Sequence, residues 1–179
     1  MASYYPSITD EQAALIDNAQ VFFVATADPA LARGPHGIGP VNLSPKGGVR
    51  LHVLGPNRVA YLDRVGSGNE TARHSMAGGP VTVMICSFEE DDAAIVRLYG
   101  RARVTAVADS PLAAGLLAAR TSHREWTARY VIEIDVESTA TSCGYGVPVM
   151  ALTRARRNED RGRRYKAPSS TSSAAPSRA

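Results

Sequence analysis

Short runs of β-branched and other apolar residues, separated by turns rich in glycine and proline, dominate the pattern of the chain. Runs of this length are typical of strands. Between residues 49 and 53, Val49, Leu51 and Val53 alternate with Arg50 and His52, as the two faces of a strand require. Strands are predicted at residues 21–26, 41–44, 49–53, 59–62, 81–86, 95–107 and 130–136.

Three short helices interrupt these strands. Thr9 and Gln12 form a capping box, in which a hydroxyl and an amide satisfy free N–H groups at a helix start. A second helix follows the turn Gly66–Thr71, and a third begins near Pro111 and runs to about Arg120. The hairpin spacing, without alternating strand–helix units, predicts a mainly β fold: an antiparallel barrel of six to seven strands with short helices.

The composition is that of one ordinary domain of 179 residues. Hydrophobic residues make up 44% of the chain and aromatic residues only 6%, so the core is expected to consist of Val, Leu, Ile and Ala. The expected organisation is an N-terminal helical segment (residues 1–20), a barrel domain (21–150) and a basic tail (151–179).

The formal net charge of +3 is unevenly distributed along the chain. Residues from Arg154 onward hold eight basic and two acidic side chains, whereas the rest of the chain holds 12 basic and 15 acidic ones. The body therefore offers no basic face for specific nucleic-acid binding. The tail is predicted to be disordered, because it cannot bury enough apolar surface to offset its ordering entropy. A solvated end and weak contact with an anionic polymer both stay open.

The sequence predicts a cytoplasmic protein without a membrane anchor. No run approaches the roughly 20 apolar residues of a membrane span. Residues 1–6 lack the basic start and the apolar run of a secretory signal. Cys86 and Cys143 lie far apart and in no metal-like spacing, which favours a reducing compartment.

The turn Gly66–Thr71 is a candidate phosphate site. Its glycines allow backbone N–H groups to face an anion, a helix start adds unpaired N–H groups, and its hydroxyl and amide side chains can donate. An ordinary helix cap, with Ser67 or Asn69 as the capping residue, explains the same pattern, and Glu70 opposes an anion unless its side chain points away. Lys46 is either a partner for the phosphate or a solvated turn lysine.

Other reactive side chains form no recognisable constellation. His36, His52, His74 and His123 have no ligand spacing, so no metal site is predicted, and they are interpreted as surface or core-edge residues. Cys143 lies between glycines and hydroxyls, but the sequence reveals no base that would activate it as a nucleophile. No catalytic residue is assigned.

Four blocks of the sequence, by their order and spacing, resemble the pyridoxamine 5′-phosphate oxidase-like superfamily of FMN-binding split barrels. The resemblance covers about residues 20–150 and points to a branch other than the vitamin B6 oxidase itself. The blocks are Val41–Gly47, Val59–Asp63 leading to Ser67, Val96–Gly100 and Ser142–Pro148.

The resemblance implies a homodimer of split β-barrels that binds FMN in a cleft between the subunits. In such proteins a strand like Val41–Ser44 lines the isoalloxazine ring, a strand end like Tyr61–Asp63 touches the flavin, and a loop like that at Ser67 meets the phosphate. The cofactor-binding residues implied for this chain are Asn42, Leu43, Ser44, Lys46, Tyr61, Leu62, Asp63, Ser67, Gly68, Asn69 and Thr71.

The candidate phosphate turn departs from the oxidase. The oxidase has an Arg-Lys pair after the serine that matches Ser67, whereas this chain has Gly68 and Asn69. The phosphate charge is then expected to be met by Lys46 and backbone N–H groups, with Arg73 as a further candidate. No counterpart of the oxidase's cluster for the pyridoxal phosphate group is found, so vitamin B6 oxidation is not expected.

The resemblance therefore implies an FMN-dependent oxidoreductase acting on an unknown small molecule, with the flavin supplying the redox chemistry. A nicotinamide and the deazaflavin F420 both stand as electron donors, and F420 is the alternative cofactor. The alternative functions are a non-enzymatic flavin-binding or sensing module and a haem-binding split barrel.

Overall fold

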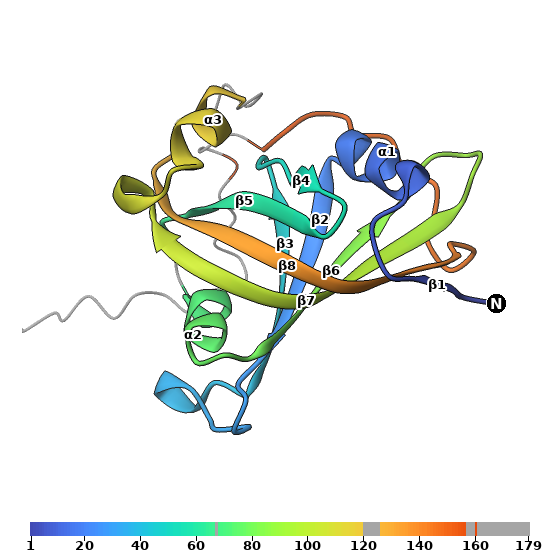
Figure 1. Cartoon of the computed structure of the whole chain (residues 1–179). Coiled ribbons are helices and arrows are strands. Elements are labelled where there is room, and N and C mark those ends of the chain that lie inside the picture. Colours follow the sequence, from blue (N-terminus) through green and yellow to red (C-terminus); the bar gives the residue numbers. More distant parts are fainter. Residues whose placement is uncertain (67, 120–125, 157–159, 161–179) are drawn as a thin grey trace, which may run out of the picture.

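The computed structural model describes residues 1–66, 68–119, 126–156 and 160, and its centre is a single curled antiparallel sheet (Figure 1). The strand order is β3-β2-β6-β7-β8-β5-β4, with β1 paired to β8. The strands are β1 (Ser3–Tyr5), β2 (Val21–Ala27), β3 (Val41–Gly47), β4 (His52–Gly55), β5 (Arg58–Arg64), β6 (Pro80–Cys86), β7 (Ala94–Ala106) and β8 (Ala128–Cys143). The helices are α1 (Asp10–Asn18), α2 (Glu70–Met76) and α3 (Ala113–Ala118), with 3₁₀ turns η1 (Pro35–Gly37) and η2 (Val107–Asp109).

The mainly β, antiparallel fold that the sequence predicts is confirmed, with one strand more than expected. The additional strand is β1, whose three exposed residues carry no burial pattern that could have revealed it. The capping box at the start of α1 is also present. Thr9 Oγ1 accepts from the backbone N–H of Gln12 at 3.3 Å, and Gln12 Oε1 accepts from the backbone N–H of Thr9 at 3.1 Å.

The main core fills the inside of the curl and consists mostly of aliphatic side chains, as the composition predicts. Strand β2 alternates half-buried and buried positions, so that Phe22, Val24 and Thr26 face inward. Phe22 meets Tyr61 edge-to-face, with ring centroids 5.3 Å apart. A second, smaller cluster lies under α3 and contains Ala60, Leu62, Ala113, Leu116 and Val131.

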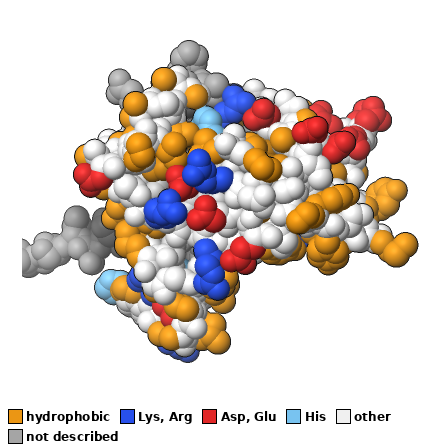
Figure 2. Space-filling view, viewed as in Figure 1, with side chains coloured by type: hydrophobic (Ala, Val, Ile, Leu, Met, Phe, Trp, Pro, Cys, Tyr) orange, Lys and Arg blue, Asp and Glu red, His pale blue; other side chains and the backbone are white. Residues whose placement is uncertain are grey.

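The pairing of β7 with β8 is the longest in the sheet. Strand β8 runs from Ala128 to Cys143, well beyond the predicted 130–136, because polar residues such as Thr139 are buried in it and mask the apolar signal. The register shifts between Tyr99 and Gly100, where a side chain on Gly100 would overlap the backbone of Asp135. The outer face over β7 and β8 carries mixed acidic and basic side chains (Figure 2), including the ion pair of Arg103 with Glu133.

The sheet path ends at β3 on one side and at β4 on the other. Between these ends, β3 and β5 approach each other through side chains, and the described strands form no backbone ladder there. Lys46 Nζ on β3 lies 3.3 Å from the Asp63 carboxylate on β5, and the Arg64 guanidinium donates to the Gly47 carbonyl at 3.3 Å. The barrel is therefore split along a seam between β3 and β5.

Several expectations fall partly outside the described residues. The end of the third predicted helix near Arg120 and most of the basic tail lie there. Among the residues that are described, no helix has both the length and the apolar character needed to cross a membrane.

The bulge at Gly100 gives a prediction about stability. The substitution Gly100→Ala should lower the free energy of unfolding by about 2 kcal/mol, because its methyl group would overlap backbone atoms that cannot move away. Gly115→Ala is the matched control, since a methyl group there meets nothing within 4 Å and alanine favours a helix by about 0.5 kcal/mol or more. Urea unfolding measures both; equal stabilities would contradict the close packing of β7 on β8.

Candidate functional site

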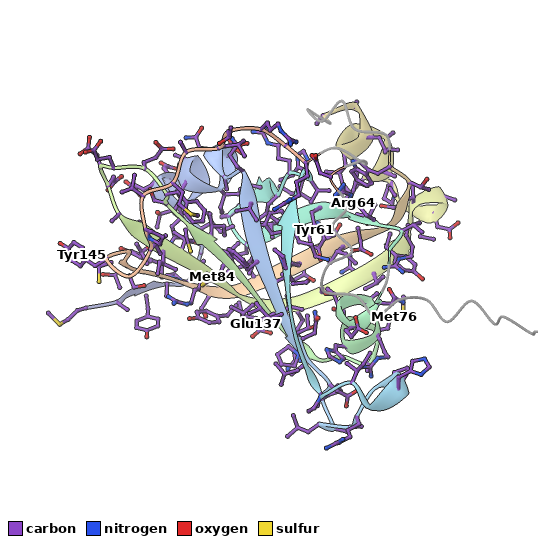
Figure 3. The ribbon with its side chains drawn as sticks, turned by 180° about the vertical axis from the view of Figure 1, so that it is seen from behind. Tyr61, Arg64, Met76, Met84, Glu137 and Tyr145 are labelled. Carbon is purple, nitrogen blue, oxygen red and sulfur yellow. The ribbon has the colours of Figure 1, made fainter. Side chains whose placement is uncertain are left out.

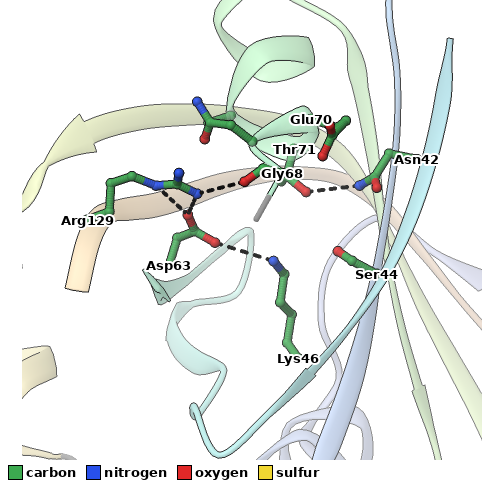
Figure 4. A pocket seen from close by; sticks show the side chains of 10 residues that line it. Asn42, Ser44, Lys46, Asp63, Gly68, Glu70, Thr71 and Arg129 are labelled. Carbon is green, nitrogen blue, oxygen red and sulfur yellow. Dashed lines mark hydrogen bonds and ion pairs between the residues drawn. The ribbon is translucent and has the colours of Figure 1, made fainter. Parts of the chain in front are cut away.

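A small polar pocket of about 80 Å³ opens at the seam, between β3, the end of β5, the start of α2 and the start of β8 (Figure 4). Segments far apart in the sequence meet there because the curl of the sheet brings β3 close to β5 (Figure 1). The pocket is lined by Asn42, Ser44, Lys46, Asp63, Gly68, Asn69, Glu70, Thr71, Ala72 and Arg129.

The carboxylate of Asp63 bridges two cations in this pocket. Asp63 Oδ1 lies 3.3 Å from Lys46 Nζ, and Asp63 Oδ2 accepts from Arg129 Nη2 at 2.8 Å and from Arg129 Nε at 3.3 Å. The side chains of Asp63, Lys46 and Arg129 are 9%, 18% and 24% exposed. Removing a partner from such a largely desolvated group of charges is costly, so the three side chains fix one another's positions.

The β3 wall of the pocket supplies hydroxyl and amide groups. The Asn42 side-chain amide donates to Thr71 Oγ1 at 3.2 Å, which leaves the Thr71 hydroxyl proton available to a ligand. The hydroxyl oxygen of Ser44 is buried and has no hydrogen-bond partner within the described parts of the chain. A buried hydroxyl without a described partner, in a pocket lined by two cations, suits an anionic oxygen ligand, so this donor set fits a phosphate group.

The turn before α2 contributes less to anion binding than its sequence suggests. Asn69 occupies the N-cap position of α2, but its side chain caps no N–H group of the described helix. The Glu70 carboxylate lines the pocket and folds back against Gly68, so it does not point away. With a helix of only seven residues and an acidic first turn, side-chain cations must provide the attraction for an anion.

The structure brings most of the predicted site residues together. Seven of the eleven line the pocket, and they are Asn42, Ser44, Lys46, Asp63, Gly68, Asn69 and Thr71. Leu43 points to the opposite face of β3 and is 66% exposed. Leu62 belongs to the core under α3, and Ser67 lies outside the described residues.

Tyr61 lies inside the main core instead of lining the pocket (Figure 3). Burial, with a smaller contribution from the nearby Asp63 charge, raises the pKa of the Tyr61 hydroxyl above its ordinary range. Lys46 Nζ lies 5.7 Å from the centroid of the Tyr61 ring, so Tyr61 contacts the site through the lysine. Whether these predicted residues contact a cofactor stays a prediction.

Sequence reasoning missed Arg129, which provides the second cation of the pocket. Arg129 immediately precedes the predicted last strand, and the pairing of β5 with β8 places Asp63 opposite Tyr130. The guanidinium of Arg129 also reaches the carbonyl of Gly68 at 3.4 Å. The only available signal was an arginine at a strand start, which becomes informative once the pairing partner is known.

The interpretation of the histidines as surface or core-edge residues is wrong for His74. His74 lies on α2 and is fully buried, and its Nε2 accepts from the Arg73 guanidinium at 3.0 Å. Its Nδ1 then carries the proton and donates to Thr26 Oγ1 at 3.0 Å. Arg73 also pairs with Asp28 at 3.5 Å, so the structure commits Arg73 to this network and not to the pocket.

Comparison with known proteins gives one similar sequence among the curated proteins. Over 155 residues the chain is 37% identical to ustO, a pyridoxamine 5′-phosphate oxidase family protein of Aspergillus flavus. The match covers 86% of this chain and 59% of that protein, so this chain spans less than two thirds of its relative's length. No model of a protein family matches the chain.

Solved structures share the fold at low sequence identity. A putative pyridoxamine 5′-phosphate oxidase from Lactobacillus delbrueckii superposes with a TM-score of 0.53 at 22% identity, over 75% of this chain and 94% of that chain. An FMN-binding protein from Syntrophomonas wolfei superposes with a TM-score of 0.52 at 12% identity, over 79% of this chain and 85% of that chain.

The orphaned hydroxyl gives a prediction that can be measured on the protein freed of small molecules. Ser44→Ala should leave the free energy of unfolding unchanged or raise it by up to about 1 kcal/mol, because it removes an unsatisfied buried polar atom. Ser142→Ala is the matched control. It should cost about 1 kcal/mol, because Ser142 Oγ accepts from Arg97 at 3.0 Å. A Ser44→Ala loss as large as that of the control would mean that the Ser44 hydroxyl is already bonded within the protein.

Proposed function

This chain belongs to the pyridoxamine 5′-phosphate oxidase-like split-barrel superfamily, and from that premise we propose that it binds FMN and acts as a flavin-dependent oxidoreductase on a small molecule. The observation that carries the proposal is the pocket at the seam. Two cations and a buried hydroxyl that has no partner among the described residues lie around a space suited to one phosphate group. The Syntrophomonas wolfei protein of the same fold is named for FMN binding, which supports the choice of cofactor.

Lys46 and Arg129 would hold the phosphate of FMN, with the Ser44 and Thr71 hydroxyls as donors. Hydrogen bonds between charged partners are about twice as strong as neutral ones, so the two cations would dominate the affinity. Arg129 also supplies a cation that the turn itself lacks, since the turn has Gly68 and Asn69 in place of the oxidase's Arg-Lys pair. The Arg129 guanidinium lies beside the carbonyl of Gly68, so the pocket has two cations, Lys46 and Arg129.

The rest of the cofactor needs more room than this pocket offers. Sites for drug-sized ligands measure about 300–1,000 Å³, whereas this pocket measures about 80 Å³. On the face of β3 opposite to the pocket lining, Val41 and Leu43 are 64% and 66% exposed, an apolar stripe at the free edge of the sheet. We therefore propose a homodimer in which the partner subunit completes the flavin site.

Bound FMN would supply the redox chemistry, taking up and passing on electrons. The side chains of this chain would bind and orient the cofactor. Asp63 holds Lys46 and Arg129 in place, and Asn42 orients the Thr71 hydroxyl. Because the chain covers only 59% of its relative's length, the substrate class and the partners also belong to this proposal.

The cofactor assignment is tested by titrating the purified protein with FMN and following flavin fluorescence. Lys46→Ala and Arg129→Ala should each weaken FMN binding by about tenfold to a hundredfold, since each removes a charged hydrogen-bond donor. Arg50→Ala is the matched control, because Arg50 is half-exposed and pairs with Asp17 at 3.1 Å away from the pocket. If Lys46→Ala and Arg129→Ala lost no more FMN affinity than Arg50→Ala, the phosphate would have to bind outside this pocket.

The oxidoreductase assignment is tested by mixing the FMN-loaded protein with reduced nicotinamides, or with reduced F420, without oxygen. The flavin absorbance should bleach with one of these donors faster than it does with free FMN. Stable FMN binding without any accelerated reduction would instead indicate a binding or sensing module.

A further inference from the structure

The seam pocket is not a simple cation cluster, because its charges balance. Lys46 and Arg129 are opposed by Asp63 and Glu70, so the formal charges of these four side chains cancel. A phosphate dianion brings two negative charges into a space that already holds two carboxylates. Like charges at such short range disfavour each other, so a bare phosphate would gain little from entering.

Asp63 cannot move away from an entering anion. Its side chain is 9% exposed, and its two oxygens already accept three hydrogen bonds from Lys46 and Arg129. Strand β5 holds its backbone in the ladder with β8. Any anion that reaches both cations therefore lies next to this carboxylate.

The same carboxylate has acceptor capacity left for a ligand hydroxyl. An ionised carboxylate offers about four lone-pair sites. Asp63 Oδ1 accepts one bond, from Lys46, whereas Oδ2 accepts two from Arg129. A hydroxyl group beside the phosphate can donate to Oδ1, and that bond offsets the repulsion that a bare phosphate would meet.

We propose that Asp63 is a specificity-determining residue that makes this pocket select the phosphate of a hydroxylated ester, a polyol phosphate, over phosphates without neighbouring hydroxyls. The inference rests on the proposed function, because the ribityl phosphate end of FMN is such a polyol phosphate. The chemical group that the pocket recognises is then the polyol phosphate itself, whatever is attached to the other end of that group.

The test compares two matched esters on the full chain by isothermal titration at fixed pH and ionic strength. Glycerol 3-phosphate carries hydroxyls beside its phosphate, and propyl phosphate has the same carbon count without them. The protein should bind glycerol 3-phosphate about tenfold tighter than propyl phosphate, the worth of one charge-assisted hydrogen bond. Equal affinities, or no binding of either ester at millimolar concentration, would overturn the inference.

Two variants separate the hydrogen bond from the bare charge. Asp63→Asn should strengthen propyl phosphate binding and lower the ratio of the two affinities, because its neutral amide oxygen accepts a weaker hydrogen bond than the carboxylate. Glu70→Gln is the matched control, because it removes the same charge from the pocket but not the acceptor held between the cations. Glu70→Gln should strengthen the binding of both esters by a similar factor and leave the ratio of their affinities unchanged. An unchanged ratio of ester affinities in Asp63→Asn would contradict the role of Asp63. If that variant fails to fold, the comparison of the two esters on the unmodified protein still tests whether the pocket selects a polyol phosphate.

Titration with FMN in the same preparations distinguishes this inference from the proposed function. FMN binding without discrimination between the two esters would overturn the inference and leave the cofactor assignment standing. Discrimination between the esters without FMN binding would overturn the cofactor assignment and support the selection of a polyol phosphate.

Discussion

The bridge from Lys46 through Asp63 to Arg129 links β3, the last strand on one side of the sheet, to β5 and β8 on the other side of the seam, and the candidate site is built around it. Backbone pairing stops at β3 on one side and at β4 on the other, so the curl cannot close with a ladder of main-chain hydrogen bonds. Charged side chains close it instead. Because buried charges need partners, this part of the wall must be polar, and it forms a pocket where a closed barrel would have packed side chains.

This arrangement gives the same residues two roles. In the free protein, Lys46 neutralises Asp63 across the seam, and Arg129 does so from β8, the strand paired with β5. In the proposed complex they would also hold a phosphate, with the Ser44 hydroxyl gaining a partner that the described chain does not give it. The balance of charge then favours a ligand that brings donors as well as an anion, which links the proposed cofactor to the selection of its hydroxylated end.

Much of the fold could be predicted because it rests on local pattern. The alternation along β2 and the capping box of α1 depend on a few residues that are close together in the sequence, and both are present in the structure. What could not be predicted depends on long-range register. Arg129 becomes a pocket residue because β8 pairs with β5, and the buried ring of His74 finds its partner in Thr26, far earlier in the chain. The length of β8 was hidden by its buried polar residues.

The most direct test of the account is a crystal structure of the protein grown with FMN. We expect the phosphate in the seam pocket, with its oxygens within hydrogen-bond distance of Lys46 Nζ, the Arg129 guanidinium and Ser44 Oγ. A flavin bound with its phosphate outside this pocket, while the bridge from Lys46 through Asp63 to Arg129 stays closed and the Ser44 hydroxyl stays unpaired, would contradict the account.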